Sequence, residues 1–117
     1  LAALERLGAA TAGKKAGRES GAGRLGVYLH NDGSVGVLVA VACETDFVAR
    51  NPEFQELSND LALHIAGSEP TTPEELLAQP FIKNPEQTVA GLLQDKIQKF
   101  GESIKIKSWQ RLVIGRS

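Results

Sequence analysis

Residues 34–43 constrain the fold of this chain more than any other segment. Valine occupies every second position, and the residues between the valines are small or apolar. This period of two predicts a β-strand, because successive side chains of a strand point to opposite faces of the sheet. One face carries Val35, Val37, Val39 and Val41, and the other carries Gly36, Leu38, Ala40 and Ala42. Since both faces can be buried, we expect this strand at the centre of a sheet.

Two further strands are expected beside it. Leu25, Val27 and Leu29 alternate with other residues, and the turn sequence Asn-Asp-Gly-Ser at 31–34 predicts a hairpin to the central strand. A last strand is expected from about Ile104 to Ile114. The alternation of apolar residues slips within it, which indicates a β-bulge near Ser108.

Three helix starts share one pattern, in which a capping residue is followed by proline and glutamate. The three are Asn51-Pro52-Glu53, Thr72-Pro73-Glu74 and Asn84-Pro85-Glu86. The first helix is expected to bury Phe54, Leu57, Leu61 and Ile65 and to end at Gly67. The second is short, around Leu76 and Leu77. The third carries Val89, Leu93, Ile97 and Phe100 and ends at Gly101.

The expected order is therefore β-β-α-α-α-β, an α+β fold in two layers. A small antiparallel sheet of about three strands packs against helices. The length of 117 residues suggests a single domain. The net charge of −1 argues against a chain that binds nucleic acid through its overall charge. With one cysteine, no secretory signal and no apolar run near the ~20 residues of a membrane span, we expect a cytoplasmic location and no membrane contact.

Two groups of residues suggest chemistry but do not support it. Residues 8–15 approach the phosphate-loop pattern, but Lys15 stands where Ser or Thr is needed to hold Mg²⁺. Cys43 with His30 or His64 would suggest a thiol nucleophile, but Cys43 continues the buried valine face, where a free cysteine usually acts as an apolar filler. We therefore predict no catalytic residue, no metal site, no cofactor and no enzymatic activity.

The segment 43–51, Cys-Glu-Thr-Asp-Phe-Val-Ala-Arg-Asn, lies between the buried strand and the first capped helix. Phe47 falls in a connection that must run over the surface. Phe47 can fold back to pack against the helix start, as residues before a cap often do. Alternatively, it is presented outward as an anchor for a partner, since aromatic residues dominate binding hot spots. The residues alone leave both interpretations open, with packing against the helix slightly favoured.

The sequence CETDFVARNPEFQELSNDLALHIA at 43–66 closely resembles the signature segment of the elongation factor Ts family, in which T-D-F-V is the hallmark. The resemblance extends upstream through GKKAGRESGAGRLGVYLHNDGSVGVLVAVA. Downstream, residues 76–115 are similar to the Q-P-F segment, the helix with I-x-x-x-G-E and the last strand of the family. The resemblance covers essentially the whole chain.

The resemblance implies a factor that binds elongation factor Tu, a GTPase, and accelerates GDP release. The family pair equivalent to Asp46 and Phe47 is pushed against the GTPase near its bound Mg²⁺, with Thr45 and Val48 completing the wedge. Glu44, Arg50 and Asn51 would make secondary contacts. Such a factor acts by binding alone and carries no metal or cofactor of its own.

The resemblance also suggests a domain organisation. Residues 1–23 are expected to be the tail of an N-terminal ubiquitin-associated-like helical domain plus a basic linker, and residues 24–117 the core domain. The T-G-x-G-M motif of the helical domain is absent from the sequence. Long family members carry two cores in tandem, so we expect this single core to form a homodimer. The alternative function is a small RNA- or ribosome-binding domain that uses Lys14, Lys15, Arg18 and Arg24.

Overall fold

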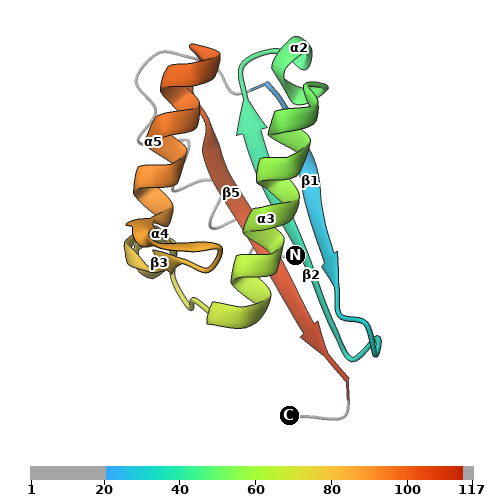
Figure 1. Ribbon diagram of the computed structural model, residues 1–117. Helices are drawn as coiled ribbons and strands as arrows, with labels where there is room; N and C mark the ends of the chain where they lie inside the picture. The colour runs from blue at the N-terminus through green and yellow to red at the C-terminus, as the bar shows by residue number, and fades with distance from the viewer. Residues whose placement is uncertain (1–20, 115–117) are drawn as a thin grey trace.

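Three antiparallel strands form the sheet that the sequence predicts, in the order β1-β2-β5. The computed structural model describes residues 21–114 (Figure 1). Its elements are β1 (Ala22–Leu29), β2 (Val35–Cys43), α2 (Asp46–Ala49), α3 (Pro52–Ser68), α4 (Pro73–Ala78), β3 (Pro80–Phe81), β4 (Asn84–Thr88), α5 (Val89–Phe100) and β5 (Lys105–Val113). The α+β class and the central position of the valine-rich strand are confirmed. No helix in this part of the chain is both long and apolar enough to span a membrane.

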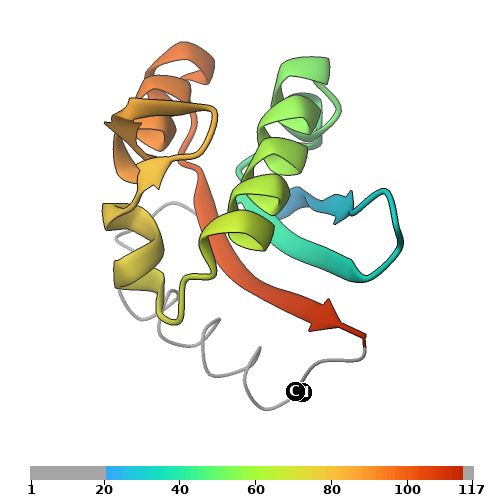
Figure 2. The same ribbon diagram turned by 60° about the horizontal axis from the view of Figure 1, so that its bottom comes forward.

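The core lies between the sheet and the helices, which gather on one side of the sheet (Figures 1 and 2). The valine face of β2 points into this core and is almost fully buried from Val37 to Cys43. The opposite face of β2 is less covered, since Leu38 is 46% exposed. Within residues 21–114 the helices thus cover one face of the sheet, and the expectation that both faces of β2 are buried holds for one of them.

Helix α3 begins as the sequence predicts. The Asn51 side chain accepts a hydrogen bond of 2.8 Å from the Glu53 amide, and Pro52 occupies the first helical position. The predicted stripe is buried throughout: Phe54, Leu57, Leu61 and Ile65. The predicted end at Gly67 is wrong, because the helix runs to Ser68 and Glu69 takes the left-handed conformation at the cap (φ 50°). Gly67 is instead needed for packing, since a Cβ there would lie 2.6 Å from the Ile82 Cδ1 atom.

The predicted helix start at Asn84-Pro85-Glu86 is also wrong. Residues Asn84–Thr88 form β4, which pairs with β3 in a short hairpin that the sequence did not indicate. The true cap of α5 is Thr88, whose hydroxyl oxygen accepts a 3.0 Å hydrogen bond from the Gly91 amide. This cap directly precedes the buried Val89, so the helix starts where its apolar stripe starts. The end at Gly101 is confirmed by its left-handed conformation (φ 72°).

The predicted bulge in the last strand is present. Ala40 pairs with Ser108 and Val41 pairs with Ile106, so Lys107 is the extra residue of β5. The extra residue restores the phase of the strand, because Ile106 and Trp109 both pack against the core.

Candidate partner-binding site

The Thr-Asp-Phe-Val segment supplies the N-cap and the first three residues of α2, a single helical turn between the end of β2 and the start of α3 (Figure 1). Thr45 is its extended N-cap (φ −131°, ψ 155°), and its hydroxyl oxygen accepts a 3.3 Å hydrogen bond from the Val48 amide. The Asn51 amide donates to the Val48 carbonyl at 3.0 Å, which closes the turn before α3. The sequence did not predict α2, because four residues are too few for a helical periodicity to be recognised.

The two halves of α2 face in opposite directions. Phe47 is 84% exposed, the highest value among the large apolar side chains of residues 21–114, and Asp46 beside it is also exposed. Val48 and Ala49 are 5% and 7% exposed and belong to the core. The interpretation that Phe47 packs back onto the start of α3 is therefore wrong. Because Val48 and Ala49 fill the space beneath the turn, Phe47 points outward.

A carboxylate from a distant part of the chain holds the beginning of this turn. Oε1 of Glu102 accepts hydrogen bonds of 3.1 Å from the backbone amides of Glu44 and Thr45. Oε2 of Glu102 accepts a 2.7 Å hydrogen bond from the Thr45 hydroxyl. In return, the Ser103 amide donates to Oε2 of Glu44 at 2.6 Å. The only indication of Glu102 in the sequence was its place in the G-E element of the family resemblance, and its role was missed.

The other predicted contact residues lie at the same end of the molecule. Arg50 is exposed, and its backbone carbonyl accepts a 3.4 Å hydrogen bond from the Gln55 side chain. The Asn51 side chain is engaged in capping α3, and Glu44 is half-buried. All seven predicted residues, 44–48, 50 and 51, lie in one stretch of the sequence, and the structure leaves Thr45, Asp46, Phe47 and Arg50 exposed.

The end of α5 and the start of α3 are joined directly beside this segment. The Glu53 carboxylate forms ion pairs with Nζ of Lys96 at 2.8 Å and with Nζ of Lys99 at 3.0 Å. The hydrogen bond from Lys96, and after it the one from Lys99, lowers the pKa of Glu53 below its ordinary value. The rings of Phe54 and Phe100 pack edge to face with centroids 6.2 Å apart. The frame that carries α2 therefore includes both long helices.

Of the candidate thiol and imidazole groups, Cys43 and His64 are packing residues, whereas His30 is exposed and its Nδ1 lies 3.0 Å from the Tyr28 hydroxyl. Cys43 is fully buried, its thiol donates to the Thr45 carbonyl at 3.3 Å, and burial raises its pKa, which disfavours the thiolate. His64 is fully buried between Gln79, whose Oε1 accepts from Nε2 at 2.8 Å, and the Ile82 amide, which donates to Nδ1 at 3.1 Å. Desolvation lowers the pKa of the ring, so His64 is neutral at pH 7. Among the described residues, no three His, Cys, Asp or Glu side chains are grouped to hold a metal ion.

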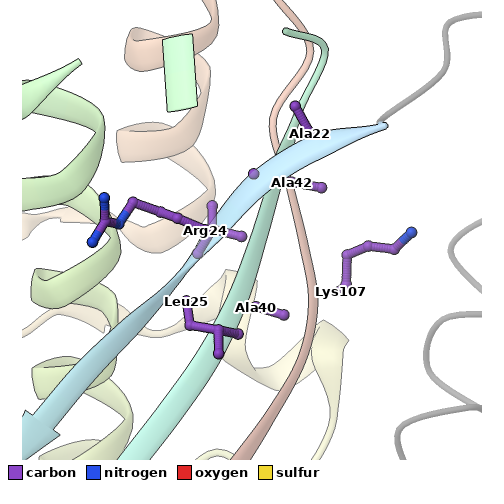
Figure 3. A pocket seen from close by; sticks show the side chains of 8 residues that line it. Ala22, Arg24, Leu25, Ala40, Ala42 and Lys107 are labelled. Carbon is purple, nitrogen blue, oxygen red and sulfur yellow. The ribbon is translucent and has the colours of Figure 1, made fainter. Parts of the chain in front are cut away.

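The basic residues of the alternative RNA-binding hypothesis are only partly described. Residues 8–15, Lys14, Lys15 and Arg18 lie outside the described range. A shallow pocket of about 300 Å³ lies on the sheet. Figure 3 shows the side chains of Ala40, Ala42 and Lys107 on one side of the strands that line it. Arg24 extends to the opposite side of the sheet, toward the helices, and its Nε atom is buried without a hydrogen-bond partner. Arg24 and Lys107 therefore do not form one basic surface.

Comparisons with known proteins agree with the resemblance. The family model described as "Elongation factor TS" matches residues 44–116, which is more than half of the chain. The chain is 38% identical to "Elongation factor Ts" of Rubrobacter xylanophilus, over 92% of the chain and 78% of that protein. It is 34% identical to "Elongation factor Ts" of Thermodesulfovibrio yellowstonii, over 97% of the chain and 79% of that protein.

A third relative, "Elongation factor Ts" of Clostridium kluyveri, is 40% identical over 97% of the chain and 37% of that longer protein. The alignment with the Rubrobacter protein spans 153 positions, more than the 117 residues present here. That relative therefore carries additional residues between the matched segments. The match of both the signature turn and the surrounding core shows that this chain belongs to the elongation factor Ts family.

Proposed function

We propose that this chain binds elongation factor Tu in the cytoplasm and accelerates GDP release by placing Asp46 and Phe47 beside the Mg²⁺ site of the GTPase. The observation that supports this most strongly is the 84% exposure of Phe47 on a turn whose other face is locked into the core. A phenyl ring held in water is costly for the free protein and gains free energy when a partner buries it. Its exposure is therefore best explained by a partner.

Exchange by this route needs a difference in affinity between two states of the GTPase. The chain must bind the nucleotide-free form more tightly than the GDP form, because a ligand shifts an equilibrium only by its differential affinity. If Phe47 is buried only in the nucleotide-free complex, this contact supplies roughly 2–3 kcal/mol of coupling. The coupling is reciprocal, so GDP must also weaken the binding of the chain.

The residues of the turn would divide this work. Phe47 supplies the apolar contact, and the neighbouring carboxylate of Asp46 supplies polar contacts near the metal site. Thr45 and Val48 complete the wedge by fixing the turn, one as its cap and the other as its buried side. Arg50 offers an exposed cation for a secondary contact, and Glu44 and Asn51 border the same surface. No bond is made or broken by the chain itself, so it acts as a binding protein and not as an enzyme.

The test is the release of fluorescent GDP from purified elongation factor Tu in the presence of excess unlabelled nucleotide. The release rate should rise with the concentration of the chain and should saturate. Binding of the chain to the nucleotide-free GTPase should be tighter than binding to the GDP form. An unchanged release rate together with equal affinity for the two forms would reject the proposed function.

The open face of the sheet supports the proposal that two copies of the core pair. It carries a continuous set of exposed apolar side chains: Leu25, Val27, Leu29, Leu38, Leu112 and Ile114. The register places Val27 opposite Leu38, and Gly36 between Leu29 and Leu112, so these side chains share one face. An apolar patch of this kind is typical of a protein interface, and a second copy would bury it against its own equivalent.

Sedimentation velocity should therefore detect a species of twice 12.5 kDa at high micromolar concentration. Val27→Asp should shift the population to the monomer, because it buries an unpaired charge in the interface. Leu77→Asp, at a 38% exposed apolar position on α4, is the matched control and should leave the dimer intact. A wild-type chain that sediments only as the monomer would reject the dimer.

A further inference from the structure

We propose that Glu102 is a positioning residue for exchange, which sets the orientation of the turn that carries Asp46 and Phe47. This inference rests on the function proposed above and adds a residue that is remote from the signature segment in sequence. Its basis is the set of hydrogen bonds by which one carboxylate binds the start of α2.

The turn needs such support because it cannot orient itself. A four-residue helix has almost no stability of its own, since helix formation requires a costly nucleus. Phe47 is 84% exposed and no residue of the described range 21–114 buries it, so its direction follows from the backbone beneath it. Val48 and Ala49 fix the buried side of the turn, so its orientation depends further on its N-cap, Thr45.

Glu102 holds this N-cap through the hydroxyl of Thr45. The Thr45 hydroxyl donates its hydrogen to Oε2 of Glu102, with 2.7 Å between the two oxygens. An oxygen lone pair then remains to accept the hydrogen bond from the Val48 amide, at an N–O distance of 3.3 Å. The carboxylate therefore selects the hydroxyl rotamer that caps α2. Its other oxygen accepts hydrogen bonds from the amides of Glu44 and Thr45, so one carboxylate holds both the backbone amide and the side-chain hydroxyl of Thr45.

Hydrogen bonds at the end of α5 hold Glu102 in place. Glu102 follows Gly101, the left-handed cap that ends α5, and the Gly101 amide donates to the Ile97 carbonyl at 2.9 Å. The reverse hydrogen bond from the Ser103 amide to Glu44 ties the same two segments a second time, at 2.6 Å. The orientation of Phe47 therefore depends on the position of the end of α5 as well as on the neighbouring β2 and α3.

A carboxylate is required because all three of its partners are donors. Glutamine at this position could still accept the two backbone amides through its oxygen. Its NH₂ group, however, would face the Thr45 hydroxyl, which could no longer donate in that direction. Glu102→Gln should therefore be intermediate between the wild type and Glu102→Ala.

The experiment measures GDP release from elongation factor Tu at increasing concentrations of Glu102→Ala, Glu102→Gln, Phe47→Ala and the double variant Phe47→Ala/Glu102→Ala. Glu102→Ala should lower the second-order rate constant of exchange by about tenfold or more, in keeping with the sensitivity of reactions to small misplacements. Glu102→Gln should fall between this and the wild type. Glu86→Ala, which removes an exposed acid of β4, is the control and should match the wild type.

The double variant distinguishes positioning from a general effect on the fold. If Glu102 acts through Phe47, its removal should cost little once Phe47 is alanine, so the two losses should not multiply. Amide hydrogen exchange should also become faster at Glu44, Thr45 and Val48 in Glu102→Ala, while Val39 in the core stays protected. This second measurement does not depend on exchange activity.

Wild-type exchange with Glu102→Ala and Glu102→Gln, alongside slow exchange with Phe47→Ala, would overturn this inference and leave the proposed function standing. Losses from Phe47→Ala and Glu102→Ala that multiply fully would also overturn it. If Phe47→Ala itself exchanges normally, the proposed function fails first. If Glu102→Ala does not fold, Glu102→Gln decides by the same comparison.

Discussion

Replacing Phe47 with alanine should slow GDP release from elongation factor Tu by about 30- to 150-fold at equal concentrations of the chain, since the lost burial of a phenyl ring is worth roughly 2–3 kcal/mol. The stability of the free chain should stay unchanged, because the ring is 84% exposed and is not part of the core. The measurement is the stopped-flow rate of fluorescent GDP release, together with thermal unfolding of the variant.

Leu77→Ala is the matched control for this variant. Leu77 is also an exposed apolar side chain, but it lies on α4, at the opposite end of the helical layer from α2 (Figure 1). Its truncation should leave GDP release unchanged. Asp46→Ala should slow release less than Phe47→Ala does, because a water-exposed carboxylate contributes less than a buried ring. A Phe47→Ala variant that is folded and releases GDP at the wild-type rate contradicts the proposed role of the turn.

Gly26→Ala should destabilise the fold by about 3 kcal/mol or more, at the upper end of the cost of overpacking a core. A Cβ at Gly26 would lie 1.9 Å from the carbonyl oxygen of Ser58, so α3 rests directly on the backbone of β1. At the same contact between β1 and α3, the Val27 amide donates a hydrogen bond of 3.0 Å to Asn59 Oδ1. The obstacle is backbone and cannot rotate away, so α3 must lift from the sheet. Urea unfolding followed by circular dichroism measures the loss.

Gly36→Ala provides the comparison within the same sheet. A Cβ at Gly36 would meet the Leu29 Cδ1 atom at 3.6 Å, which is ordinary contact. Alanine there should be neutral or stabilise by about 0.5–1 kcal/mol, because glycine loses more conformational freedom on folding. Equal stabilities of the two variants at one protein concentration would show that α3 does not sit on Gly26 as described.

The sequence alone was sufficient for features that depend on neighbouring residues. The alternation of valines specified β2, because successive side chains of a strand point to opposite faces of the sheet. The caps Asn51, Thr72 and Gly101 were identified because capping acts within one helical turn. The bulge in β5 followed from the slip in its own alternation. The Thr-Asp-Phe-Val segment stood out from its place between a buried strand and a cap, but only the resemblance to the elongation factor Ts family made it the candidate site.

Wrong predictions arose where two local patterns competed. Asn84-Pro85-Glu86 has the residues of a helix start, yet it pairs with β3 in the hairpin. Thr88 supplies an equally good cap and stands directly before the buried Val89. Gly67 looked like a helix end, yet its missing side chain leaves room for Ile82. Hairpin pairing with β3 in the first case, and packing against Ile82 in the second, decided between alternatives that local propensity could not separate.

The sequence by itself thus determined the three strands of the main sheet and the start of α3, and it singled out the segment between them, but it missed α2 and the β3–β4 hairpin. Only the tertiary structure decided that Phe47 points outward and that Glu102, 57 residues from Thr45, holds the turn that carries it. The physical reason is that the direction of an exposed ring is set by what is packed beneath it. That packing joins the ends of β2 and α5, which come together only when the core forms.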